Sequence, residues 1–315
     1  MKTDRVEQQL EQLRALRPLG PTPPVIAALR KALRDRVNVI VAKAASISAE
    51  LQLQTLVPDL LQAFERLFDK PLECDRQCWG KNAIVKALKD LGHAESAPFL
   101  RGLRYIQMEP AWERPVDTAN VLRGMCALAL VQCSDITRDE TILHLIDAAT
   151  ESTATVRRDA ALAIEQMAGR EAVSLLRMKA RVGDDEPEVT GQVFESLLRL
   201  DPGASVGFVA GFLEGKNEQV AEEAALALGA SRLAAALETL TRAWKKSKNN
   251  ALGPVLLRAI SASRSDDSLE FLFSIVREGR QSEREDALRA LEIHRDSEDI
   301  RRRTEEALAR MARKS

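Results

Sequence analysis

A short helical pattern recurs along the chain, and it constrains the fold more than any other feature of the sequence. Its clearest copy, over residues 156–164, reads VRRDAALAI, and its apolar residues share one side of a helix of 3.6 residues per turn. Related segments begin at Val37, Trp79, Leu122, Val156, Val189, Val220, Leu252 and Glu283. From Leu122 onward these starts lie 31 to 34 residues apart, whereas the first two steps are 42 and 43 residues. Such a period, with two helical patterns in each unit, is typical of an α-solenoid.

The composition agrees with a helical array. Alanine, leucine, glutamate and arginine dominate, and aromatic residues make up only 4% of the chain. We therefore predict an all-α, right-handed α-α superhelix of about eight helix pairs with capping helices at both ends. Residues 1–24 are expected to form an amphipathic helix with a proline-rich tether, residues 25–295 the repeat array, and residues 296–315 a C-terminal capping helix. A dimerisation or partner-docking role is the alternative for the first helix.

The repeats resemble HEAT repeats, in particular the short HEAT-like repeats common in prokaryotic proteins. The resemblance is carried by GDDEPEV before the helix at Val189, by VRRDAALAI at Val156, and by the segment from Val220 to Leu240. In such families a turn with Asp and Pro leads into the second helix of each pair, and an arginine often follows the first buried valine, as Arg157 does here. The resemblance implies a scaffold that binds proteins or nucleic acids and is occasionally an enzyme, so it does not settle the function.

Charge and composition narrow the class of protein. The formal net charge is −1, so the chain as a whole attracts neither nucleic acid nor an anionic membrane. No apolar run approaches the ~20 residues of a membrane span, and the N-terminal MKTDRVEQQL lacks the apolar core of a signal peptide. Four cysteines are too few for a disulfide framework in a chain of this length, which fits a reducing compartment. We expect a cytoplasmic protein that does not bind membranes.

Two insertions account for the two long steps of the repeat. They lie at residues 69–78 (DKPLECDRQC) and 107–116 (QMEPAWERPV), and both join the first helix of a pair to the second. Because such turns share one edge of a solenoid, the insertions should lie side by side. Trp112, between two prolines, either tucks back onto the repeat, which we expect, or is presented to a partner. Trp79 and Trp244 are expected in the core.

The chain carries no recognisable catalytic or cofactor motif. The three histidines are scattered, and the sequence has neither a nucleophile elbow nor a glycine-rich phosphate loop. Cys74 and Cys78 are four residues apart, and Cys126 and Cys133 are seven apart, which does not match the spacing of zinc ribbons. Cys126 is expected to be a small buried side chain. We predict no catalytic residue, no metal and no cofactor.

The exposed positions of the second helices are the predicted contact surface, because these helices line the concave side of HEAT-like solenoids. The candidates there are Lys81, Arg123, Arg157, Arg158, Gln192, Glu195, Glu222, Glu223 and Arg258. Positive residues lead in the N-terminal half and negative residues follow, so a partner of opposite polarity would complement them; an ordinary mixed surface is the alternative.

These observations favour a non-enzymatic scaffold or adaptor that binds a protein partner through the concave face and the edge that carries Trp112. The alternative is a nucleic-acid binder, with or without glycosylase activity, that uses Lys81, Arg123, Arg157 and Arg158. HEAT-like alkylpurine DNA glycosylases place Trp, Asp and Arg in a basic groove, and this chain has Trp112, Asp117 and Arg123 close together in sequence. A third alternative is a helper subunit that resembles the HEAT-like phycobilin lyases.

Overall fold

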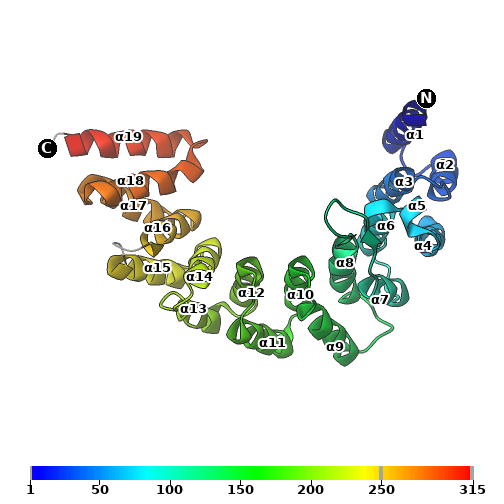
Figure 1. Ribbon diagram of the computed structural model, residues 1–315. Helices are drawn as coiled ribbons and strands as arrows, with labels where there is room; N and C mark the ends of the chain where they lie inside the picture. The colour runs from blue at the N-terminus through cyan, green and yellow to red at the C-terminus, as the bar shows by residue number, and fades with distance from the viewer. Residues whose placement is uncertain (1, 248–250, 313–315) are drawn as a thin grey trace. The chain divides into compact units, whose positions relative to one another are not determined.

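The computed structural model of the protein describes residues 2–247 and 251–312, and it is built almost entirely of helices (Figure 1). The prediction of an all-α helical repeat fold is therefore confirmed. The chain divides into two compact units, Met1–Gln166 and Met167–Ser315. Met1 of the predicted N-terminal segment and residues 313–315 of the predicted C-terminal cap lie outside the described residues. No described helix is long and apolar enough to span a membrane.

The N-terminal unit consists of helix pairs and the two insertions. Its helices are α1 (Lys2–Leu16), η1 (Arg17–Leu19), α2 (Pro23–Leu33), α3 (Asn38–Glu50), η2 (Gln54–Leu56), α4 (Val57–Arg66), α5 (Pro71–Cys74), η3 (Arg76–Cys78), α6 (Trp79–Asp90), α7 (Ala97–Leu103), α8 (Asn120–Leu130), α9 (Arg138–Ala149) and α10 (Ala154–Met167), whose last residue falls in the second unit. The second helices α3, α6 and α8 pack against one another in sequence order. A short antiparallel ribbon of β1 (Met108–Glu109) and β2 (Val116–Asp117) precedes α8.

The C-terminal unit repeats the same arrangement with shorter connections. Its helices are α11 (Gly169–Val182), α12 (Pro187–Leu200), α13 (Pro202–Ala210), α14 (Glu218–Ala230), α15 (Ala234–Ser247), α16 (Leu252–Ala262), α17 (Asp266–Glu278), α18 (Gln281–Leu291), η4 (Glu292–His294) and α19 (Glu298–Ala312). Helices α12, α14, α16 and α18 form a row in which each packs against the next. Gly183, at a φ of +84°, ends α11, and Pro187 begins α12, so the turn uses a residue that tolerates left-handed backbone and one that is pre-set for a helix start.

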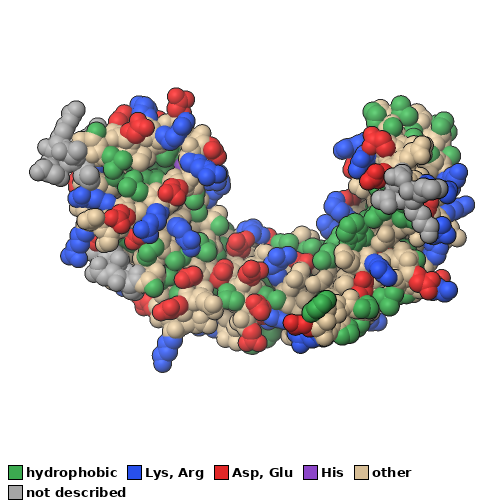
Figure 2. Space-filling model, turned by 45° about the horizontal axis from the view of Figure 1, so that its top comes forward, with side chains coloured by type: hydrophobic (Ala, Val, Ile, Leu, Met, Phe, Trp, Pro, Cys, Tyr) green, Lys and Arg blue, Asp and Glu red, His purple; other side chains and the backbone are tan. Residues whose placement is uncertain are grey.

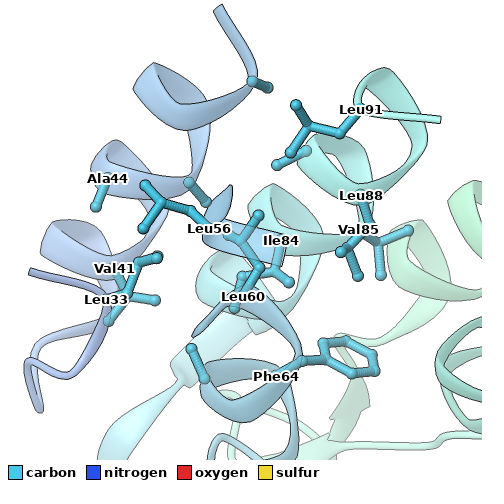
Figure 3. Packing of buried hydrophobic residues seen from close by; sticks show 14 of the residues in the cluster. Leu33, Val41, Ala44, Leu56, Leu60, Phe64, Ile84, Val85, Leu88 and Leu91 are labelled. Carbon is cyan, nitrogen blue, oxygen red and sulfur yellow. The ribbon is translucent and has the colours of Figure 1, made fainter. Parts of the chain in front are cut away.

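The core of the N-terminal unit lies between the two rows of helices. Figure 3 shows Leu56 and Leu60, from the first-helix side, directed into the space between α3 and α6. Phe64 on α4 and Ile84 on α6 are also fully buried there. The buried α4 residues recur every three or four positions along the helix, as expected for an element that buries one face.

Small residues bring the second helices close together. Ala160 and Ala163 of α10, predicted to allow close packing, are both completely buried. One close approach is in the C-terminal unit, where Gly229 of α14 faces the backbone of α16 at Ala259 and leaves no space for a side chain. The alanine-rich composition therefore reflects helices that pack with their backbones close together.

Candidate functional site

The two insertions lie side by side in the N-terminal unit, as predicted. The first folds into α5 and η3, and the second forms the β1–β2 hairpin. Gln107 Nε2 donates a hydrogen bond to the backbone oxygen of Asp75 over 2.9 Å, and the backbone N–H of Gln77 donates to Glu109 Oε1 over 2.5 Å. The insertions therefore form a single hydrogen-bonded edge, named here the insertion edge (residues 69–79 and 105–119).

A buried ion pair holds the first insertion to α6. The side chains of Asp75 and Lys81 are fully buried, and Lys81 Nζ lies 2.8 Å from Asp75 Oδ2. Lys81 Nζ also donates to the Leu67 backbone oxygen over 3.1 Å. The carboxylate of Asp75 accepts further hydrogen bonds from the N–H groups of Gly80 (2.7 Å) and Lys81 (3.1 Å). Every charge is compensated, so this pair is well placed to fix the geometry of the edge.

The burial of Lys81 corrects the prediction that it belongs to an exposed contact surface. On an isolated α6 its side chain would face solvent, but the first insertion covers this part of the helix. The ammonium group also lies 5.2 Å from the ring centroids of both Phe68 and Tyr105. Lys81 is therefore a structural residue here, out of reach of a partner.

Arg123 is the second predicted contact residue that is buried. Its guanidinium group bonds the carboxylates of Asp117 (2.6 Å) and Glu151 (3.1 Å), and it donates to the Tyr105 backbone oxygen over 3.0 Å. Only 4% of its side chain is exposed. Arg123 therefore joins the base of the hairpin to the loop before α10, and it does not project from the surface. Asp117 and Arg123, two of the residues considered for a glycosylase site, form an ion pair with each other.

Two carboxylates organise the hairpin from within. Burial opposes the ionisation of Glu109, but hydrogen bonds from Gln77, Gln107 and Thr118 outweigh it and lower the pKa of Glu109. The pKa of Asp117 is lowered against burial in the same way, by the backbone N–H groups of Ala119 and Gln107 and by Arg123. Both side chains are thus held as carboxylates by the hydrogen bonds that shape the hairpin.

Trp112 stands at the tip of this hairpin and is completely exposed, at 101% of its reference area. The expectation that it tucks back onto the repeat is therefore wrong. The β1–β2 pairing of Met108 with Asp117 and of Glu109 with Val116 fixes the base of the loop, and the intervening residues 110–115 carry the indole ring away from the body. A fully exposed Trp on a loop whose base is fixed is unusual unless the residue binds a partner.

Trp79 is also exposed, at 53%, which corrects its assignment to the core. It is the first residue of α6 and follows Cys78, whose backbone is left-handed at a φ of +54°. This entry directs the indole outward, where its Nε1 donates to Gln77 Oε1 over 3.1 Å. Trp244, in contrast, is buried as predicted and packs edge-to-face on Phe271 at 5.5 Å.

Other large apolar side chains of the insertion edge and of the start of α8 are also exposed. The exposed members of this group, named here the hairpin apolar surface, are Leu72, Trp79, Ile106, Met108, Trp112, Val116 and Val121. Met108 and Val116 lie on opposite faces of the β-ribbon, because they are not cross-strand partners and fall one register position apart. Figure 2 shows hydrophobic side chains gathered in patches over the N-terminal unit, at the right of the view. The insertion edge thus exposes large apolar side chains on both faces of its ribbon, and exposed apolar area is typical of interaction sites.

The remaining predicted contact residues lie on second helices. Arg157 is half-buried and donates to the backbone oxygens of Glu151 (2.9 Å) and Ser152 (2.8 Å). Arg158 is exposed and pairs with Asp159 at 3.1 Å. Arg157 and Arg123 thus both bind Glu151: Arg157 donates to its backbone oxygen, and Arg123 donates to its carboxylate.

In the C-terminal unit the predicted contact residues form an acidic group and a separate cation. Glu222 and Glu223 are half-buried on α14, and Gln192 and Glu195 are half-buried on α12. Burial, with the neighbouring charges of Glu188, Glu195 and Glu222, raises the pKa of Glu223. Arg258 is exposed on α16.

The cysteines do not form a metal site in the part of the chain that the structure describes, where no group of three or more His, Cys, Asp or Glu side chains could hold an ion. All four are free thiols. Burial raises the pKa of Cys78 to about 12, so this thiol is protonated and unreactive at neutral pH. Cys126 is completely buried, as predicted.

Three residues that organise the edge, Asp75, Gln107 and Glu109, were not among the predicted site residues. Their position could have identified them, because they lie in the insertions that break the repeat period. Polar side chains in such insertions need hydrogen-bond partners once the insertions pack together.

No family model and no curated protein matches the chain. Among solved structures, human deoxyhypusine hydroxylase in complex with glycerol is 19% identical over 86% of this chain and 96% of that chain, with a TM-score of 0.31. The crystal structure of an engineered protein is 12% identical over 97% of this chain and 95% of that chain, with a TM-score of 0.36. At these levels of similarity, neither structure indicates an activity, a ligand or a partner for this chain.

Proposed function

We propose that the protein is a non-enzymatic scaffold that binds a partner protein through the hairpin apolar surface, with Trp112 as the central contact. The observation that carries the proposal is the complete exposure of Trp112 on a hairpin whose base is held by buried hydrogen bonds and ion pairs. A side chain presented from a preorganised loop loses little conformational entropy when it binds. The partner would supply an apolar pocket for the indole ring.

The rest of the site supports binding by an apolar surface. Trp79 and Met108 add large exposed side chains near the hairpin base, and tryptophan is enriched among residues that dominate binding energies. The nucleic-acid alternative has less support, because Lys81 and Arg123, two of the four cations on which it depended, are buried in ion pairs. We place this role in the cytoplasm, which suits four cysteines that remain thiols.

The test is a quantitative comparison of variants. Tagged wild type, Trp112→Ala, and the control Leu143→Ala would be used to capture proteins from native lysate treated with nuclease, followed by mass spectrometry. Leu143 is a suitable control because it is also exposed, at 61%, but lies on α9 away from the insertion edge. If Trp112 is a hot spot, Trp112→Ala lowers the affinity of a captured partner by roughly 30-fold or more, as a loss of about 2 kcal/mol requires.

The captured partner would then be purified and its affinity for each variant measured by calorimetry. Leu143→Ala should bind as wild type does. Equal binding by Trp112→Ala and wild type would contradict the proposal, and the loss of every partner on nuclease treatment would favour the nucleic-acid alternative.

A further inference from the structure

A second site lies in the N-terminal unit, where α1, the connection from α2 to α3, and the segment of α5 and η3 come together. Figure 1 shows α1, α3 and α5 in this region. The structure has a cavity of about 540 Å³ there. Three arginines from three separate segments line it: Arg5 of α1, Arg36 of the α2–α3 connection, and Arg76 of η3. This cavity is named here the arginine cavity.

The acidic side chains of the cavity are already engaged elsewhere. Asp35 Oδ1 accepts the backbone N–H of Val37 at 2.9 Å, and Glu73 lies 4.0 Å from the ammonium group of Lys70. Neither carboxylate forms an ion pair with the cavity arginines among the described residues. The lining therefore carries three guanidinium groups against these two carboxylates, which leaves a net formal charge of +1.

The arginines retain donors for a ligand. Arg76 uses Nε to donate to the Leu72 backbone oxygen at 3.0 Å, which orients the group and leaves its two terminal nitrogens without a hydrogen-bond partner among the described residues. Its charge also helps to lower the pKa of Glu109. Arg5 and Arg36 make no ion pair within the described residues. Asn38 holds the cavity wall in place, because its Nδ2 donates to Asp75 Oδ1 and to the Arg76 backbone oxygen, both at 3.2 Å.

We propose that the arginine cavity binds a phosphomonoester group. Planar guanidinium groups bind phosphate oxygens through paired, charge-assisted hydrogen bonds, and several arginines around one cavity can match the two negative charges of a phosphomonoester. The phosphate can belong to a phosphorylated peptide or to a small phosphorylated metabolite.

An adjacent cavity of about 280 Å³ offers a way to tell these two sources apart. It shares Gln9 and Asp35 with the arginine cavity and is lined by apolar side chains that include Leu13, Leu16 and Ile40. A peptide with leucines beside its phosphoserine can fill both cavities, whereas a small metabolite fills only the first.

The test uses fluorescence anisotropy with a labelled peptide in which leucines flank one phosphoserine, together with its unphosphorylated twin and a version with alanines in place of the leucines. Wild type should bind the phosphorylated peptide, with an affinity that falls as salt is added. Arg36→Gln and Arg76→Gln should each weaken binding about tenfold, and Arg258→Gln, the same change at an exposed position of the other unit, should not. All three positions are exposed, so the variants are expected to fold.

Tighter binding of the leucine peptide than of the alanine peptide would identify a phosphorylated protein segment as the source. Equal binding of both peptides, with full competition by O-phosphoserine, would identify a small metabolite. Equal affinity for phosphorylated and unphosphorylated peptides, or unchanged binding by both arginine variants, would overturn the proposal. Trp112→Ala should leave this binding unchanged, so the outcome is separate from that of the proposed partner surface.

Discussion

Breaking the Asp75–Lys81 ion pair should destabilise the insertion edge strongly. At the observed 2.8 Å, and with an effective dielectric constant of about 20, the attraction between the two charges is about 6 kcal/mol, and the desolvation of both groups offsets much of it. Removal of one partner leaves the other charge buried, which costs about 3–5 kcal/mol. Asp75→Asn and Lys81→Met should each reduce stability by this amount.

The contacts that each variant keeps indicate which of the two loses more stability. In Lys81→Met the Asp75 carboxylate keeps hydrogen bonds from the backbone N–H groups of residues 80 and 81 and from Asn38. In Asp75→Asn the ammonium group keeps the Leu67 oxygen and the two aromatic rings but has no compensating charge. We expect Asp75→Asn to be the more harmful change. The double variant buries no charge and should lose at least about 2 kcal/mol less than the sum of the single losses.

The measurement is native-state amide hydrogen exchange, because it reports the opening of the insertion edge itself, whereas urea unfolding reports a whole compact unit. The amides of Gly80 and Lys81 report directly, since both donate to the Asp75 carboxylate. Their opening free energies in the four proteins complete a double-mutant cycle. Single losses below about 1 kcal/mol, or losses that simply add in the double variant, would refute the reasoning.

Three further predictions concern packing, pH and exposure. Gly229→Ala should destabilise the C-terminal unit by about 1–3 kcal/mol in urea unfolding, since the new Cβ would lie 2.7 Å from the Ala259 carbonyl carbon. The control Gly207→Ala, whose new Cβ would lie in open space on α13, should stabilise the unit by up to about 1 kcal/mol. Asp117→Asn should lower the unfolding free energy measured by urea titration at pH 6, and its difference from wild type should shrink below about pH 4. The folded state lowers the pKa of Asp117, so its carboxylate stabilises the fold at pH values above the unfolded-state pKa, and this contribution is lost as the pH falls through the folded-state pKa. Trp112→Ala should change the unfolding free energy by less than about 0.5 kcal/mol, because the side chain is fully exposed; a larger loss would show that the indole packs against the fold.

The sequence by itself determined the elements of the fold and their order. Helical periodicity is local, so apolar residues three and four positions apart identify a buried face without knowledge of the neighbours. For this reason the buried positions of Ala160, Cys126 and Trp244 were predicted correctly. The repeat period also placed the two insertions at one edge, since a solenoid returns each turn to the same side.

Only the tertiary structure decided which side chains of the insertion edge face solvent. Lys81 and Arg123 occupy positions that would be exposed on their own helices, but ion-pair partners from other segments cover them. The partner of Lys81 is Asp75, 6 residues earlier in the chain, and a partner of Arg123 is Glu151, 28 residues later. Trp79 and Trp112 lie where a large apolar side chain would be expected to bury itself, but a left-handed residue and a paired hairpin direct them outward. The physical reason is that helical periodicity describes a helix and its repeat neighbours, whereas an insertion adds partners that follow no period, and their charges and backbone geometry then determine which groups are buried.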